Sequence, residues 1–182
     1  GSLDTSLFAM DVTLSADGNT AFVADNLDGL DIIDVSNLSS PSLTGTYDTS
    51  HSAQKVTLSP DGNTAFVADG ISGLQIIDVS NPASPSLTAT YGTFNTLNVV
   101  SVTLSADGNT AFVGDIYDGI YIIDVSNLSS PSLTGTYDTS GGAYDVILSA
   151  DGNTAFVADY SDGLDIIDVS NLSLIHISEP TR

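Results

Sequence analysis

The chain has 182 residues, of which 22 are Asp and one is Glu, against one Lys (Lys55) and one Arg (Arg182), giving a formal net charge of −21. Two basic residues cannot build a cationic surface, which excludes binding to the phosphate backbone of nucleic acids or to anionic membranes. Hydrophobic residues make up 41% of the chain, enough for a packed core. No apolar run approaches the roughly 18 residues that membrane insertion needs.

Residue usage predicts an all-β fold. The chain is rich in Asp, Ser, Thr, Gly, Val and Ile and poor in Glu, Lys, Arg and Met, which favours strands and turns over helices. It has no cysteine, so it can form neither disulfides nor thiolate metal sites, and it has no thiol nucleophile.

The chain is an internal repeat. The string Asp-Gly-Asn-Thr-Ala-Phe-Val begins at Asp17, Asp61, Asp107 and Asp151, at intervals of 44, 46 and 44 residues. The string Ile-Ile-Asp-Val-Ser-Asn recurs in the same phase. A period of this length with several short strands per copy is typical of a β-propeller blade. We expect four blades, at residues 9–50, 51–94, 95–140 and 141–182, after a lead-in of residues 1–8 whose Gly1-Ser2 start resembles a cloning remnant.

Each copy divides into four predicted strands, named A to D in chain order. In the first copy they cover residues 9–15, 21–25, 30–35 and 42–47. Strand B is apolar on both faces, as in a sheet packed between two others, whereas strand D is half polar. We therefore expect strand A to be innermost and strand D outermost. Gly18 and Asn19 are expected to supply the positive φ that the A–B turn requires.

The repeated motifs resemble those of the LVIVD-repeat β-propellers of bacterial and archaeal surface proteins, which are related to YVTN-type and WD40-like repeats. The shared motifs are Leu-Ser-Ala/Pro-Asp-Gly-Asn-Thr-Ala-Phe-Val, Gly-Leu/Ile-x-Ile-Ile-Asp-Val-Ser-Asn and Pro-Ser-Leu-Thr-Gly/Ala-Thr-Tyr, and they cover about residues 9–172. The resemblance implies a non-catalytic module that is extracellular or at the cell surface.

Differences among the four copies fall in the D–A and B–C connectors, which lie at one end of an antiparallel four-stranded blade. Variable loops on a rigid scaffold are where recognition usually occurs. Aromatic rings among Asp and Asn side chains suit a carbohydrate, peptide or protein ligand; unconstrained drift of the loops is the alternative. The candidate binding face comprises Phe8, Met10, His51, Gln54, Lys55, Phe94, Asn95, Asn98, Tyr117, Tyr121, Tyr144 and Tyr160.

The B–C hairpins are candidate Ca²⁺ sites. We expect the protein to require no cofactor. Ca²⁺ prefers oxygen ligands, and two copies carry three carboxylates within seven residues. The second and third copies break the set, and Asp at turns commonly serves the turn itself. The candidate metal ligands are Asp25, Asp28, Asp31, Asp159, Asp162 and Asp165.

Catalysis is not expected. The only histidines are His51 and His176, so no arrangement of nucleophile, base and orienting group can be assembled. A metal-dependent hydrolase that uses Asp11 and Asp145 in the central channel is one alternative to a binding module. A purely structural propeller fragment without a ligand of its own is the other.

The tail after Asn171-Leu172-Ser173 departs from the repeat and resembles translated adapter or cloning sequence. We expect residues 174–177 to act as the outer strand of the fourth blade, antiparallel to residues 165–169. Four blades would leave apolar faces exposed at both ends unless they wrap into a small ring. We therefore expect a homodimer, in which two half-rings form an eight-bladed propeller.

Overall fold

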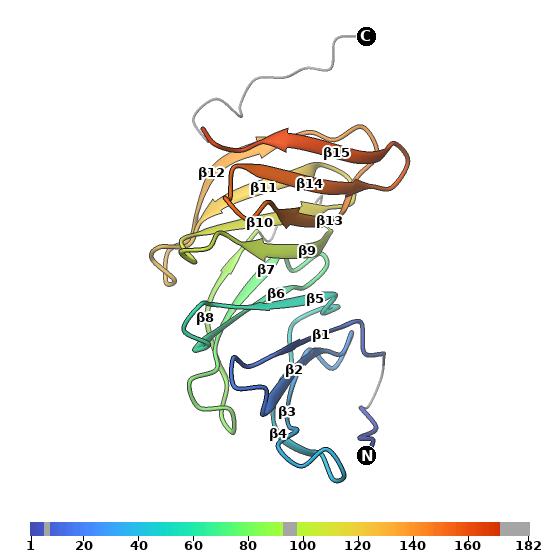
Figure 1. Ribbon diagram of the computed structural model, residues 1–182, viewed down its shortest axis with the longest axis vertical. Coiled ribbons are helices and arrows are strands. Elements are labelled where there is room, and N and C mark those ends of the chain that lie inside the picture. Colours follow the sequence, from blue (N-terminus) through green and yellow to red (C-terminus); the bar gives the residue numbers. More distant parts are fainter. Residues whose placement is uncertain (6–7, 93–97, 172–182) are drawn as a thin grey trace.

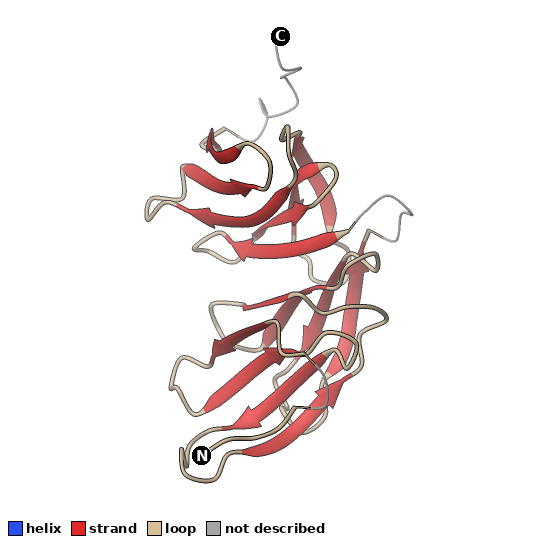
Figure 2. Ribbon diagram, turned by 90° about the vertical axis from the view of Figure 1, so that its right-hand side faces the viewer, coloured by secondary structure: helices blue, strands red, loops and turns tan. Residues whose placement is uncertain are grey.

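The computed structural model describes residues 1–5, 8–92 and 98–171, and this part of the chain contains strands, turns and loops only (Figures 1 and 2). The predicted all-β class is confirmed. No helix in the described part of the chain is long and apolar enough to cross a bilayer.

Four antiparallel sheets follow one another along the chain, one for each repeat. The first three have four strands each in sequential order, and the fourth has three strands within the described residues. The strands are β1 (Asp11–Leu14), β2 (Thr20–Ala24), β3 (Leu30–Asp34), β4 (Ser42–Tyr47), β5 (Lys55–Leu58), β6 (Thr64–Ala68), β7 (Leu74–Asp78), β8 (Ser86–Tyr91), β9 (Val99–Leu104), β10 (Thr110–Asp115), β11 (Gly119–Asp124), β12 (Ser132–Tyr137), β13 (Ala143–Leu148), β14 (Thr154–Asp159) and β15 (Gly163–Asp168). The predicted outer strand of the fourth blade, at residues 174–177, lies outside the described residues.

The first strand of each sheet lies next to the first strand of the following sheet, so β1, β5, β9 and β13 form the inner edge of the array. The outermost strands β4, β8 and β12 each pair with only one other strand of their own sheet. The predicted order from inside to outside is therefore confirmed. Figure 1 shows the four blades as a fan, with β1 to β4 at one end and β13 to β15 at the other.

The core consists of the interfaces between consecutive blades. Phe22 and Ile32 of the first blade pack against Val56 and Val67 of the second, and all four side chains are buried. The equivalent contacts recur between the second and third blades and between the third and fourth. Because each interior sheet is covered on both faces, its second strand is apolar on both faces, as the sequence predicted. The third strand of the second blade also carries Gln75 and ends in Asp78.

A tight hydrogen-bonded turn joins the first two strands of each blade. In the first blade, Ser15 Oγ donates to Asp17 Oδ1 at 2.6 Å, and the backbone N–H of Asn19 donates to the same oxygen at 3.1 Å. Gly18 has the expected positive φ of 70°. The prediction for Asn19 was wrong, because its φ is not positive; its amide instead donates to Asp17 Oδ2 at 3.0 Å.

Candidate functional site

The two variable connectors of each blade meet at one end of the sheets. Asn26, in the B–C turn of the first blade, forms a β-bridge with Ala53 in the connector that leads into the second blade. Gly70 forms the same bridge with Val99 one blade later. The D–A and B–C connectors thus lie side by side on one face of the array, as the topology predicted. We call this surface the loop face.

A buried aspartate at the end of the second strand supports the loop face in every blade. Asp69 Oδ1 accepts a hydrogen bond from Thr49 Oγ1 at 2.7 Å, and Asp69 Oδ2 accepts one from the backbone N–H of His51 at 3.1 Å. Burial raises the pKa of Asp69, and these hydrogen bonds oppose that rise. The donors belong to the connector that precedes the blade, so the pair ties one blade to the next.

The same aspartate recurs at Asp25, Asp115 and Asp159, each buried. Thr5 Oγ1 donates to Asp25 Oδ1 at 3.2 Å, and the backbone N–H of Gly141 donates to Asp159 Oδ2 at 3.0 Å. This structural role was not predicted from the sequence. The signal was present, because a threonine stands 20 residues before three of the four aspartates.

An exposed pair of aromatic rings stands on the loop face of the fourth blade. Tyr144, predicted in the D–A connector but found in β13, and Tyr160, from the B–C turn, stack with their ring centroids 4.9 Å apart and an angle of 24° between the planes. Both side chains are exposed, Tyr160 by 76%. Tyr117, in the B–C turn of the third blade, is also exposed. Tyr144 and Tyr160 therefore form a stacked pair, the tyrosine platform, with an open side that reaches solvent.

Two of the other residues predicted on the loop face have side chains that are hydrogen-bonded to nearby residues. Tyr121 donates its hydroxyl to Asp118 Oδ2 at 2.9 Å, and burial together with that hydrogen bond raises its pKa strongly. Gln54 Nε2 donates to Ser52 Oγ at 2.6 Å, within its own connector. These polar groups are held by neighbouring residues.

The other candidates lie at three different places. Phe8 and Met10 are exposed at the start of the first blade. The backbone N–H of Asn98 donates to Asp115 Oδ2. Phe94 and Asn95 lie outside the described residues.

Equivalent positions on the inner strands bring four polar residues towards the central channel, namely Asp11, Lys55, Ser101 and Asp145. Lys55 Nζ forms an ion pair with Asp145 Oδ1, which also accepts a hydrogen bond from Ser101 Oγ at 2.9 Å. Burial alone would raise the pKa of Asp145, but the hydrogen bond and charge of Lys55 hold it below its ordinary value. Asp11 Oδ2 accepts the backbone N–H of Val56 at 3.0 Å. The two carboxylates are therefore engaged separately.

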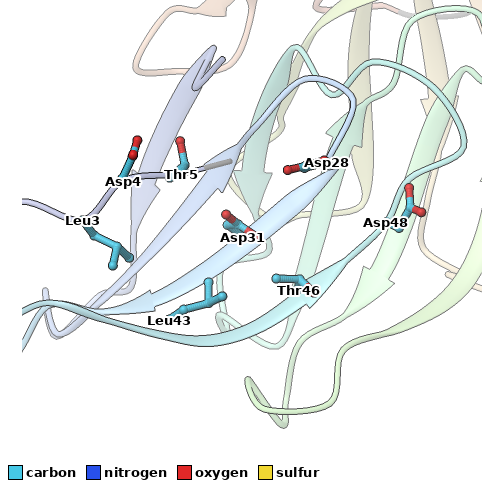
Figure 3. A pocket seen from close by; sticks show the side chains of 8 residues that line it. All are labelled: Leu3, Asp4, Thr5, Asp28, Asp31, Leu43, Thr46 and Asp48. Carbon is cyan, nitrogen blue, oxygen red and sulfur yellow. The ribbon is translucent and has the colours of Figure 1, made fainter. Parts of the chain in front are cut away.

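An acidic cavity of about 360 Å³ adjoins the first predicted calcium site. Figure 3 shows Leu3, Asp4 and Thr5 on a separate stretch of chain beside the strands that carry Asp31 and Thr46. Asp28 and Asp31 both line this cavity. Burial raises the pKa of Asp31, and the negative charges of Asp25 and Asp28 raise it further.

The structure does not gather either predicted calcium set into a coordination shell. Within residues 1–5, 8–92 and 98–171, no group of three or more His, Asp or Glu side chains is placed to hold a metal ion. The buried aspartate of each set turns towards donors of the connector instead. In the fourth blade, burial raises the pKa of Asp165, and the charges of Asp159 and Asp162 add to the rise. Calcium binding at these residues stays a prediction that the geometry does not support.

Solved structures of β-propellers share this fold. Kuenenia stuttgartiensis hydrazine synthase is 20% identical with a TM-score of 0.75, over 92% of this chain and 48% of its own. The β-propeller domain of Myceliophteria thermophila Cps50 (Swd1) is 14% identical with a TM-score of 0.73, over 93% and 55%. A putative 6-phosphogluconolactonase from Bacteroides uniformis is 17% identical with a TM-score of 0.76, over 88% and 50%. The chain thus spans about half the length of these structures.

Sequence comparison gives a more specific assignment than the fold alone. No curated protein is similar enough to this chain to count as a match. The LVIVD repeat matches four times, at residues 8–49, 51–93, 101–139 and 140–180, and these matches follow the four sheets. The chain therefore belongs to the LVIVD-repeat family of β-propellers.

Proposed function

We propose that this protein is a non-catalytic β-propeller module that binds carbohydrate through the loop face. The observation that carries the proposal is the exposed, stacked pair formed by Tyr144 and Tyr160. The pair contributes little to the interblade core, because neither ring belongs to the buried clusters between the sheets. Two large rings held in solvent, one on β13 and one on the B–C turn of the same blade, are better explained by a ligand than by folding.

The chemistry of the platform suits a sugar ring. An aromatic face has a negative quadrupole, and it packs well against the flat C–H surface of a pyranose. Ser161 and Asp162 follow Tyr160 in the same turn and offer hydroxyl and carboxylate groups to sugar hydroxyls. A strongly anionic ligand is disfavoured by the net charge of −21, so we propose a neutral or cationic glycan.

Existing contacts support a binding role over a catalytic one. Asp145 is paired with Lys55, and Asp11 accepts a backbone N–H, so neither inner-strand carboxylate is poised as a free acid or base. The Nδ1 atom of His51 is buried and lies close to Gly70, since a Cβ built on Gly70 would be only 2.7 Å from it. This ring nitrogen is therefore not open to a substrate. The extracellular or cell-surface setting expected from the family belongs to the same proposal.

Glycan-array binding followed by calorimetry on the positive glycans tests the proposal. Changing Tyr144 or Tyr160 to Ala should abolish binding, whereas Phe at either position keeps the stacking ring and should retain most of the affinity. Leu133→Ala serves as a control, because Leu133 is an exposed residue on the outer strand of the third blade. Unchanged binding by both Ala variants would refute the proposal. A blank array for the wild type would favour the purely structural alternative.

A further inference from the structure

The two ends of the blade array expose surfaces that are buried inside it. Val12 of the first blade is 60% exposed, whereas Val56, at the same position of the second blade, is 2% exposed. At the opposite end, Leu164 of the fourth blade is 61% exposed, whereas the equivalent Leu30 is fully buried. We call the free surface of the first blade the entry face and that of the fourth blade the exit face.

Entry and exit faces are complementary, because inside the array they contact each other. The exit side of the first blade, with Phe22 and Ile32, packs on the entry side of the second, with Val56 and Val67. The fourth blade carries Phe156 and Ile166 at the equivalent exit positions, and Ile166 is exposed. The entry face of a second chain could therefore cover the exit face of this one, and its exit face could cover this chain's entry face, through the same contacts that join the blades within one chain.

The first five residues occupy the place of an outer strand from a preceding blade. A Cβ on Gly45 of β4 would meet the carbonyl of Pro82 in the next blade, and a Cβ on Gly1 would meet the carbonyl of Leu38. Gly1 stands 44 residues before Gly45, and Leu38 stands 44 residues before Pro82, so the two contacts are equivalent in the repeat. Thr5 Oγ1 bonds Asp25 as Thr49 Oγ1 bonds Asp69, at the same offset.

The fourth blade has the matching edge. Strands β3, β7 and β11 each pair with an outer strand, whereas β15 pairs only with β14 within the described residues. In the first blade, Leu30 on β3 lies opposite Tyr47 on β4. Leu3 stands 44 residues before Tyr47, and Leu164 is the counterpart of Leu30. Residues 1–5 of one copy would thus lie along β15 of another without leaving their place on the first blade.

We infer that two copies of this chain close an eight-bladed ring, in which the exit face of each copy packs on the entry face of the other. Residues 1–5 of each copy then lie along β15 of the other, in the place predicted for residues 174–177. The contact is head to tail and occurs twice around a twofold axis, so no apolar end remains free.

Ring closure would also extend the tyrosine platform. Asn26 and Gly70 bridge to the connector of the following blade, and Tyr160 is their counterpart in the fourth blade. In the ring, its neighbour is the connector of the second copy that carries Phe8 and Met10, both exposed in the single chain. The mass of the assembly is measured without a ligand, so this inference and the carbohydrate proposal can fail independently.

Light scattering after gel filtration tests the ring in the 182-residue chain. We expect twice the 18.7 kDa of one chain, with dimerisation strengthened by added salt because screening weakens the repulsion between two chains of −21. Val12→Glu on the entry face and Leu164→Glu on the exit face should each give monomers. Both side chains are exposed in the single chain, so the variants should fold, and Leu133→Glu on an interior blade should remain dimeric.

The pattern of variants distinguishes the ring from other dimers. A mixture of Val12→Glu and Leu164→Glu chains should regain heterodimers, since one of the two contacts then joins unaltered faces. Loss of the dimer in only one of the two variants would indicate a contact between like faces and would overturn the inference. A wild-type monomer at about 0.5 M salt would overturn it as well.

A cysteine pair tests the strand contact. The chain has no cysteine, so Leu3→Cys with Leu164→Cys introduces the only thiols. Directly opposed residues of paired strands have Cα atoms about 4.5–5.5 Å apart, which a disulfide can span. Oxidation should give a covalent dimer on a denaturing gel, because the two positions of one chain lie at opposite ends of the array (Figure 1). The pair of Leu3→Cys with Leu133→Cys should not cross-link; equal cross-linking of both pairs would overturn the assigned register.

Discussion

Replacing Asp31 by Gln should stabilise the protein, because the second blade has a buried, hydrogen-bonded glutamine at the equivalent position. Asp31 is buried on the third strand of the first blade, and Gln75 is its buried counterpart in the second. Gln75 Oε1 accepts a hydrogen bond from Thr90 Oγ1 at 2.8 Å, and its Nε2 donates to the carbonyl of Ser72 at 3.2 Å. The first blade has Thr46 at the equivalent of Thr90 and the backbone carbonyl of Asp28 at the equivalent of Ser72.

The expected gain follows from those two hydrogen bonds. A typical intramolecular hydrogen bond contributes about 1 kcal/mol net, and the variant also loses a desolvated charge that two neighbouring carboxylates repel. Because geometry will not be ideal in the new blade, we expect a gain of about 1–2 kcal/mol at pH 7. For a chain of this length, that corresponds to an increase in Tm of about 2–8 °C.

The gain should depend on pH with a definite sign. Burial raises the pKa of Asp31 in the folded protein, with Asp25 and Asp28 adding to the rise, so the unfolded chain ionises this group at lower pH than the folded protein does. The folded state is therefore penalised at neutral pH, and the penalty disappears as the pH falls below the pKa of the unfolded chain. Near pH 3, Asp31→Gln should therefore lose the part of its advantage that comes from removing the buried charge and keep the part that comes from the two hydrogen bonds.

Urea denaturation of both proteins at pH 7 and pH 3, at one protein concentration, measures the effect. Asp165→Gln is the matched control, because Asp165 holds the same position in the fourth blade but is less buried. Its gain should be smaller. Equal stability of Asp31→Gln and wild type at pH 7, or a gain that is the same at both pH values, would refute the reasoning.

Two further changes test the contacts between blades. Thr49→Val removes the hydroxyl donor of the buried Asp69 and should cost about 2–3 kcal/mol at pH 7 by urea denaturation, with less effect near pH 3; Thr139→Val should cost under about 0.5 kcal/mol, because Thr139 Oγ1 has no partner among the described residues, and equal losses would contradict this. Gly73 and Gly62 both have positive φ, but a Cβ on Gly73 would lie 2.0 Å from the carbonyl oxygen of Gly92, whereas a Cβ on Gly62 meets nothing within 4 Å. In the same assay we expect a loss of about 1 kcal/mol for Gly62→Ala and of more than about 3 kcal/mol for Gly73→Ala; similar losses would show that φ alone matters.

The repeats made most of the fold predictable. Strand D of the first copy was predicted at residues 42–47 and is observed there, because its alternation is local and Pro41 ends the preceding turn. Strand A was predicted at residues 9–15 but pairs only over Asp11–Leu14. Of its first residues, Met10 donates its backbone N–H to the carbonyl of Ala24 at 2.7 Å but lies outside the regular strand.

Features that depend on contacts between residues far apart in the sequence could not be predicted from the local pattern. Asp25 was taken as a candidate metal ligand because it stands near Asp28 and Asp31 in sequence, yet its side chain is buried and accepts a hydrogen bond from Thr5. The stacking of Tyr144 on Tyr160 requires that β13 and the B–C turn of the same blade hold the two rings at a set distance. Sequence indicates that both rings lie on the loop face, but only the structure gives their separation.

The bond from Thr49 to Asp69 also affects how the array folds. The second blade receives a donor from the end of the first blade, and the first blade receives one from residues 1–5, so part of the stability of each comes from the chain on its N-terminal side. Such nearest-neighbour coupling makes a repeat array cooperative over a few units, and it lets a single chain that is not closed into a ring fray from its ends. Residues 1–5 cap the first blade in this scheme. In the monomeric Leu164→Glu variant, native-state hydrogen exchange should therefore be slowest in β6 and β10, and trimming the first five residues should accelerate exchange in β2 before it affects β10.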